Sequence, residues 1–447
     1  MSRVIVRVSV LVIPVAVLAL ALPASHPLTV LIYDADPSHI WNRLYAALFV
    51  RQDASGETFG ADSLDPAPVM LSRHLLEKKS HHSAIRVMDE FLHTHAETLV
   101  PYPLRRAVLA RDLWAVFDWT VERRSMNPRD PTYDAEKKEL QVRLAEILRR
   151  LALTPQEIEA LPDNYAEAVA SGRFPKDYDQ THPERAFLPP DLFDPHGPWV
   201  LIQGSDKPPA EQHVSFFSGR SRFLIFIRLP AGRKATFDYL RQLWEYPQPW
   251  VKRSDAADQT ELNPLLPSFP ADTQVALVRQ MTLFDDHGNL RAAPITESVQ
   301  IRVYRSVPPV NTRPTATTTG IAASGQQFYE IRLDRGLLFA GLQGGLREIT
   351  RDEKELFLFN AAAGDELDDP KATVDWSRVP PILERCAMCH SGPGIQSLNS
   401  RAALVKPNPM QHDAGNGFDQ ESTLSWKKNR DSWSALNGYW KPAQTPR

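Results

Sequence analysis

The stretch Val299-Gln300-Ile301-Arg302-Val303 alternates apolar and polar side chains without a break. Side chains alternate between the two faces of a β-strand, so this pattern predicts a strand in a sheet with one buried face and one wet face. Other apolar runs of strand length are bounded by glycine or proline and occur at 199–202, 214–217, 222–229, 274–284 and 327–333. We therefore expect a mainly β, α+β domain over residues 190–362, with a helix at 234–246.

Residues 28–175 show a helical period instead. Thr154-Pro155-Gln156-Glu157 has the composition of a capping box with proline at the first helical position, and it predicts a helix that ends at Gly172. The stretch 104–121 predicts a heavily buried helix. Apolar residues recur at helical spacing at Leu140, Leu144, Ile147, Leu148 and Leu151. An α-helical N-terminal domain is expected over 28–175.

The composition is that of an ordinary globular chain. Its 447 residues are 43% hydrophobic and 23% charged, and this length allows two or three domains. The formal charge of −3 provides no basic surface for nucleic acid. Nucleotide-loop and hydrolase motifs are absent from the sequence, and the glycine-rich stretch 341–345 lacks the phosphate-loop lysine, so we interpret it as a turn.

The first residues resemble a targeting segment. Arg3 and Arg7 precede an apolar run at 8–22, and Pro23-Ala24-Ser25 follows it. This arrangement predicts a cleaved secretory signal over residues 1–24 and therefore an exported, periplasmic protein. An uncleaved anchor is the alternative, although the run is short for a membrane span. No later apolar run approaches spanning length, so we expect no membrane span in the mature chain.

The only two cysteines lie in Cys386-Ala387-Met388-Cys389-His390. This C-x-x-C-H spacing is that of covalent haem attachment. Residues three and four apart share one face of a helix, so both thiols can add to porphyrin vinyl groups while the imidazole reaches the iron. We expect a short helix from Pro381 that ends in this motif. A backbone carbonyl in the following stretch, 391–394, can accept a hydrogen bond from His390 Nδ1 and fix the ligating tautomer.

Other interpretations of the motif are weaker. A zinc site usually needs four protein ligands, and no second cysteine pair supplies them. A thioredoxin-like dithiol needs a preceding strand, whereas Val379-Pro380-Pro381 precedes this motif. A structural disulfide would close a very short loop and stabilise little.

At this motif the sequence resembles the c-type cytochromes, and we expect a small helical haem module over residues 363–447. The resemblance implies one covalent haem c per chain, bound through Cys386 and Cys389, with His390 as the proximal iron ligand. Pro407-Asn408-Pro409-Met410 is similar to the methionine loop of class I cytochromes, which implies Met410 as the sixth ligand. His412, Met281, His287 and an open distal face are the alternatives.

Two further features of this segment carry expectations. Trp426, Trp433 and Trp440 recur every seven residues around a predicted helix at 422–436, and this stripe is expected to be core. In class I cytochromes a closing helix packs on the one that precedes the motif. Candidate cations for the haem propionates are Arg385, Arg401, Lys406 and Lys427.

A second possible metal motif lies in the N-terminal segment. Glu90 and His93 have the spacing of a di-iron ligand pair, but that site needs a second such motif and the chain has none.

The sequence as a whole therefore predicts a multidomain α+β, exported monohaem c-type cytochrome that transfers single electrons to or from a redox protein or a small-molecule donor or acceptor. The alternative is a haem-dependent periplasmic oxidoreductase or peroxidase with substrate over an open distal face. A third hypothesis is a redox or scaffolding protein without haem.

Overall fold

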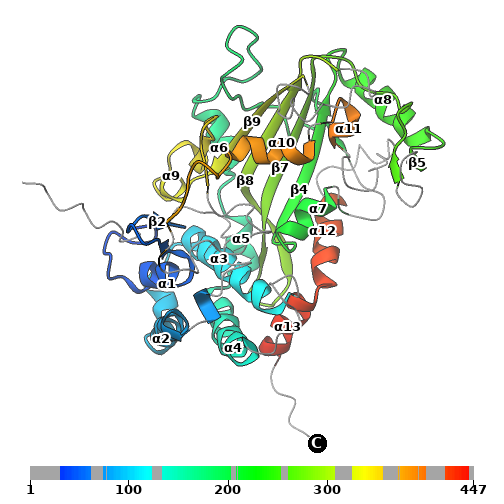
Figure 1. Cartoon of the computed structure of the whole chain (residues 1–447). Coiled ribbons are helices and arrows are strands. Elements are labelled where there is room, and N and C mark those ends of the chain that lie inside the picture. Colours follow the sequence, from blue (N-terminus) through cyan, green and yellow to red (C-terminus); the bar gives the residue numbers. More distant parts are fainter. Residues whose placement is uncertain are drawn as a thin grey trace, which may run out of the picture.

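The computed structural model describes residues 31–61, 74–76, 78–122, 133–202, 208, 210–252, 260–307, 325–355, 371, 373–390, 392–398 and 418–441. The chain has a mixed α+β fold, as expected, in which helices surround one large antiparallel sheet (Figure 1). We call it the main sheet.

Within the described residues the main sheet has six strands in the order β10-β9-β8-β7-β4-β3. Their bounds are β3 Val200–Ile202, β4 Ser221–Arg228, β7 Thr273–Phe284, β8 Leu290–Tyr304, β9 Gln326–Leu333 and β10 Leu346–Glu348. Two small hairpins pair β1 Arg51–Gln52 with β2 Thr58–Phe59, and β5 Trp250–Lys252 with β6 Thr260–Leu262. The strands predicted at 199–202, 222–229, 274–284 and 327–333, and the strand around Val299, are confirmed.

The helices precede, interrupt and follow these strands. Their bounds are α1 Ile40–Phe49, α2 Lys78–His93, α3 Pro103–Val121, α4 Asp134–Leu151, α5 Pro155–Glu159, α6 Asn164–Ala170, α7 Glu211–Phe216, α8 Arg233–Glu245, α9 Arg335–Phe339, α10 Ile382–His390, α11 Ile395–Leu398, α12 Phe418–Lys428 and α13 Asp431–Trp440. Short 3₁₀ turns are η2 His74–Leu76, η3 Ala96–Thr98 and η6 Gln343–Gly345. As expected, glycines of the stretch 341–345 form a turn.

Three local predictions were wrong. The capping box of Thr154 and Glu157 forms, but the helix that it starts, α5, ends at Glu159. A separate helix, α6, follows with Asp163 as its N-cap, because Pro162 disfavours a continuous helix. Residues 214–217 lie in and just after the helix α7, in which Val214 and Phe217, three positions apart, face the same apolar cluster. The predicted helix at 422–436 is two helices, α12 and α13.

The two faces of the main sheet differ in chemistry. Val299, Ile301 and Val303 pack in a core against the segment of α5 and α6. The opposite face carries Gln300 and Arg302, which were expected to be wet. Instead α10 lies across it (Figure 1), and only 4% of Arg302 is exposed. The strand pattern therefore predicted the two faces correctly, but the polar face is covered by a helix from the C-terminal segment.

A second core joins distant segments of the chain. It contains Trp114 of α3, Phe284 of β7 and Trp433 of α13. The rings of Trp114 and Trp433 lie 5.8 Å apart, and Trp440 donates a hydrogen bond to the carbonyl of Ala145. Trp433 and Trp440 belong to this core, as predicted, and they pack on α3 and α4, whereas the partly buried Trp426 packs against the cluster of Val214 and Phe217. Side chains from all three expected domains thus share this cluster.

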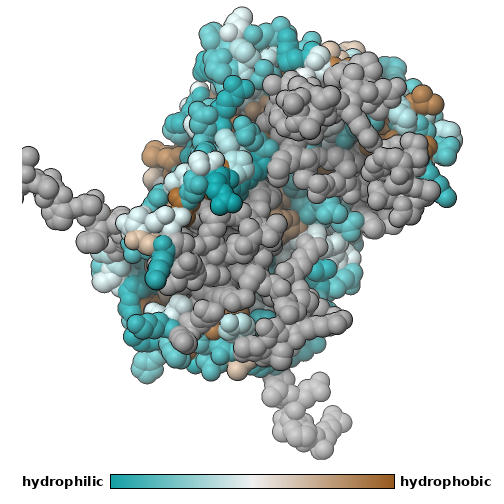
Figure 2. All heavy atoms as spheres, in the orientation of Figure 1, coloured by the Kyte–Doolittle hydropathy of each residue, from teal (hydrophilic) through white to brown (hydrophobic). Residues whose placement is uncertain are grey.

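One face of the molecule is mainly polar among the described residues (Figure 2). On the face shown in Figure 2, hydrophilic side chains dominate among the described residues, and hydrophobic atoms are scattered. None of the helices in the described ranges is both long and apolar enough to cross a membrane.

Candidate functional site

The helix α10 presents the C-x-x-C-H motif to the main sheet. It begins directly after Pro381, and Ile382 and Leu383 pack against Phe328 of β9 and against Ile349. The expected short helix is therefore present, and it ends at His390. The side chains of 387–389, which include Cys389, lie outside the described residues.

The thiol of Cys386 faces the polar side of the sheet. Its Sγ lies 3.8 Å from Glu330 Oε2 and 3.7 Å from Gln300 Nε2. Burial, and next the negative charge of Glu330, raise the pKa of this thiol well above its usual value. Cys386 is therefore a neutral thiol in contact with β8 and β9.

His390 follows four residues later and shares a helix face with Cys386. Its Nδ1 lies 2.7 Å from the carbonyl oxygen of Ser397, and Arg302 donates to the same carbonyl at 3.3 Å. Since a carbonyl can only accept, Nδ1 carries the proton and Nε2 keeps its lone pair. The predicted hydrogen bond that fixes the tautomer of His390 is present, although its acceptor is the carbonyl of Ser397 and not one of 391–394.

The turn after α10 is held from several sides. The Tyr304 hydroxyl is hydrogen-bonded to Ser397 Oγ, which also donates to the Gly394 carbonyl. Gln326 donates to the His390 carbonyl at 3.1 Å. A Cβ at Gly394 would lie 2.1 Å from Ser268 Oγ, so only glycine allows this close approach. The strand ends therefore fix the position of the imidazole.

A second imidazole lies opposite the first. His213 of α7 has a ring plane within 6° of that of His390, and the ring centroids are 5.9 Å apart. Its ring also lies 5.2 Å from that of Phe223. Burial and then the charges of Arg302 and Arg279 lower the pKa of His213 to about 4, and the same burial and Arg302 lower the pKa of His390. Both imidazoles are therefore neutral at physiological pH.

His213 was missed by sequence reasoning. The strand predicted at 214–217 placed its neighbourhood in a regular sheet, and one histidine far from the motif carries no spacing signal.

Guanidinium groups and aromatic rings complete the site. Arg302 lies over the ring of Phe328, and Arg279 lies over the ring of Phe217, with distances of 5.6 Å and 4.4 Å to the centroids. These groups fit haem c: a neutral thiol and a ligating imidazole tautomer on one helix face, cations suited to propionates, and apolar rings suited to a porphyrin.

The expected propionate partners have different positions. Lys427 is fully buried, 2.7 Å from Asp118, and lies over the Trp114 ring, so that expectation was wrong. Arg385 is buried on α10. Arg401 and Lys406 lie outside the described residues.

Some of the candidates for the sixth ligand lie outside the described residues, and the others lie far from His390. Met410 and His412 lie outside the described residues, so both stay predictions. Met281 is buried in the core on the other face of the sheet. His287 is exposed in the β7–β8 turn, at the opposite end of the strands from Tyr304. The last two alternatives were wrong, because the main sheet separates Met281 from His390 and His287 lies at the far end of the strands.

The possible di-iron pair does not form a site. Arg43 binds both carboxylate oxygens of Glu90, and His93 is exposed. Among the described side chains, no group of three histidine, cysteine or acidic residues is arranged to hold a metal ion.

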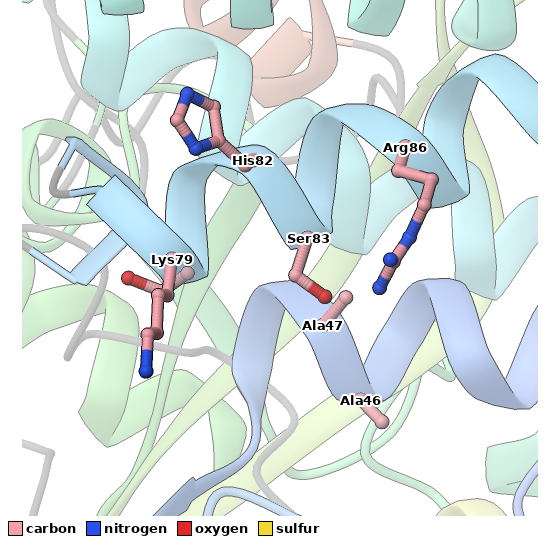
Figure 3. A pocket seen from close by; sticks show the side chains of 7 residues that line it. Ala46, Ala47, Lys79, His82, Ser83 and Arg86 are labelled. Carbon is pink, nitrogen blue, oxygen red and sulfur yellow. The ribbon is translucent and has the colours of Figure 1, made fainter.

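A pocket of about 650 Å³ lies between α1 and α2, on the helical side of the molecule (Figure 3). Ser83 and Arg86 point toward α1, whereas His82 points away from it (Figure 3). The lining residues are Ala46, Ala47, Lys79, Ser80, His82, Ser83 and Arg86. None of them belongs to the motif or to the helix that carries it.

No protein family, curated protein or solved structure matches this chain.

Proposed function

We propose that this chain is an exported monohaem c-type cytochrome that transfers one electron at a time. Cys386 and Cys389 would hold the haem covalently, and His390 would be its proximal ligand. The observation that carries the proposal is the hydrogen bond from His390 Nδ1 to Ser397, which leaves Nε2 available on the helix face that also carries Cys386.

The bound haem would supply the one-electron redox couple. The chain's own residues orient and tune it. Ser397 holds the imidazole of His390 in one tautomer, while Arg302 adds positive charge beside both imidazoles. The helix α10 covers the polar face of the main sheet and limits access of water to this region.

The proposal includes the remaining expectations from the sequence. Residues 1–24 would be removed on export to the periplasm, and residues 363–447 would form the haem module. The helical segment 28–175 and the mainly β segment 190–362 would dock the redox protein, or admit the small-molecule donor or acceptor, with which electrons are exchanged.

The test is expression with periplasmic haem c maturation. We expect a pyridine haemochrome spectrum of the c type and a mass increase of one haem on the mature chain. The double variant C386A/C389A should lack both signals, whereas H287A should keep them. A colourless wild-type protein without added mass would contradict the proposal and favour a thiol or scaffolding role.

A further inference from the structure

We infer that His213 is the second axial ligand of the haem iron, on the side opposite His390. This inference rests on the proposed function and specifies the coordination of its metal.

The spacing of the two rings matches a shared metal. Two imidazoles on opposite sides of one metal each place a nitrogen at about 2.0–2.1 Å, and each ring centroid lies roughly 1.2 Å further out, so the centroids are about 6.4 Å apart. Rings stacked directly face to face would be separated by about 3.5–4 Å, and only an offset stack would reach about 4.5–7 Å. The observed 5.9 Å between His213 and His390 is close to the first value, and the 6° between their planes allows both to bind edge-on along one axis.

The ring nitrogens of His213 are free to coordinate. Within the described residues, no side chain or carbonyl forms a hydrogen bond with either nitrogen. The residue is partly exposed. A ring that is partly exposed and has no such partner can accept a metal ion without losing a protein hydrogen bond. His390 offers its own Nε2 for the reason given above.

The position of His213 is fixed by the fold. Val214 and Phe217, which follow it in sequence, pack with Phe223 and Leu277 of the main sheet. The second ligand would therefore come from the central segment and not from the motif's own module, where Met410 lies. The haem would connect α7 to α10 across the polar face.

Two consequences separate this assignment from the methionine loop. Two imidazoles give a six-coordinate, low-spin iron without a sulfur-to-iron charge-transfer band. They also give a lower reduction potential than a histidine and methionine pair.

The experiment compares variants of the purified holoprotein. In H213Q we expect conversion of most of the ferric haem to high spin in absorption and electron paramagnetic resonance spectra, with unchanged covalent haem content. Added imidazole should restore the low-spin spectrum. M410A, H412A and the surface control H287A should keep the wild-type spectrum.

A second substitution distinguishes loss of the iron ligand from misfolding of the protein. H213M keeps a ligating side chain, and we expect it to remain low spin, to gain the sulfur band and to have a higher potential. A low-spin spectrum unchanged in H213Q, or its loss in M410A or H412A, would overturn the inference alone. Wild-type protein without covalent haem would overturn both the proposed function and this inference.

Discussion

The Nδ1 atom of His390 lies 2.7 Å from the carbonyl oxygen of Ser397, seven residues further along the chain. This contact closes the turn between α10 and α11 and determines which nitrogen of the imidazole is free. Since Tyr304 of β8 in turn holds the hydroxyl of Ser397, the orientation of the ring depends on the main sheet.

Replacing Tyr304 by Phe should loosen this turn. The ring would keep its contact with Phe269, but the hydrogen bond to Ser397 Oγ would be lost. We expect the free energy of unfolding to fall by about 1 kcal/mol in denaturant titrations. Y102F, at an exposed tyrosine, is the matched control and should have no effect. Equal stabilities of Y304F and the wild type would contradict the anchoring role.

Neutralising Arg302 should change the redox behaviour of the haem-loaded protein. Its charge lies close enough to lower the pKa of both His213 and His390, so it would also disfavour the more positive ferric state of a bound haem. In R302Q the reduction potential should fall, on the order of tens of millivolts. Potentiometric titration measures this shift. R305Q, which removes a cation paired with Asp272, should give a much smaller shift.

Asp285 should contribute stability that depends on pH. Burial disfavours its charge, but hydrogen bonds from the backbone of Asn289 and from Arg291 outweigh burial and lower the pKa of the carboxyl. Between the lowered folded pKa and the unfolded value of about 3.9, the unfolded chain binds more protons, so acid removes the stabilisation.

The matching variant is D285N. At pH 7 it should be less stable by about 2 kcal/mol, because charged hydrogen bonds are lost. The difference should shrink as the pH falls below about 4. D286N, at the exposed neighbour, should show no such trend in denaturant titrations. A constant difference from pH 7 to pH 3 would argue against the lowered pKa.

Glycine at position 344 should be indispensable. Its φ is +60°, and a Cβ there would lie 1.9 Å from the carbonyl oxygen of Asn164. G344A should therefore destabilise the protein by more than about 3 kcal/mol in thermal or denaturant unfolding. Gly341 also has a positive φ, +66°, but open space around it, so G341A should cost only about 1 kcal/mol. Similar costs for both would show that α6 can move aside.

A buried ion pair joins three segments of the chain. Arg335 of α9 donates to both carboxylate oxygens of Asp112 in α3, and the Tyr33 hydroxyl also donates to this carboxylate. Removing one charge leaves the other buried, so D112N should lower the free energy of unfolding by about 3–5 kcal/mol.

The control for D112N is D238N, which removes an exposed pair with Lys234 and should cost less than about 1 kcal/mol. A loss of similar size in both variants would mean that water reaches Asp112.

The sequence predicted the elements better than their contacts. The alternation at Val299 and the run at 274–284 identified the strands, because period-2 burial is a local property. The same alternation suggested a wet face, and it could not reveal that α10 covers Arg302, because a helix and a strand far apart in sequence leave no shared pattern.

The candidate site was predictable in part for the same reason. Cys386 and His390 lie four residues apart, and helix geometry alone brings them to one face. The acceptor for His390 Nδ1 was predicted within 391–394, and the observed acceptor, Ser397, lies just beyond that stretch. His213 is brought to the site only by the packing of α7 on β4, which depends on apolar contacts spread over several strands.

The position of α10 over the main sheet (Figure 1) has a consequence for the order of folding and haem attachment under the proposed function. In the folded chain the thiol of Cys386 contacts Glu330 and Gln300 on the main sheet. Under the proposed function, this thiol would have to leave both contacts to form a thioether, so haem attachment would come before α10 docks on the strands. A variant in which this segment docks faster should therefore carry less covalent haem in the pyridine haemochrome assay.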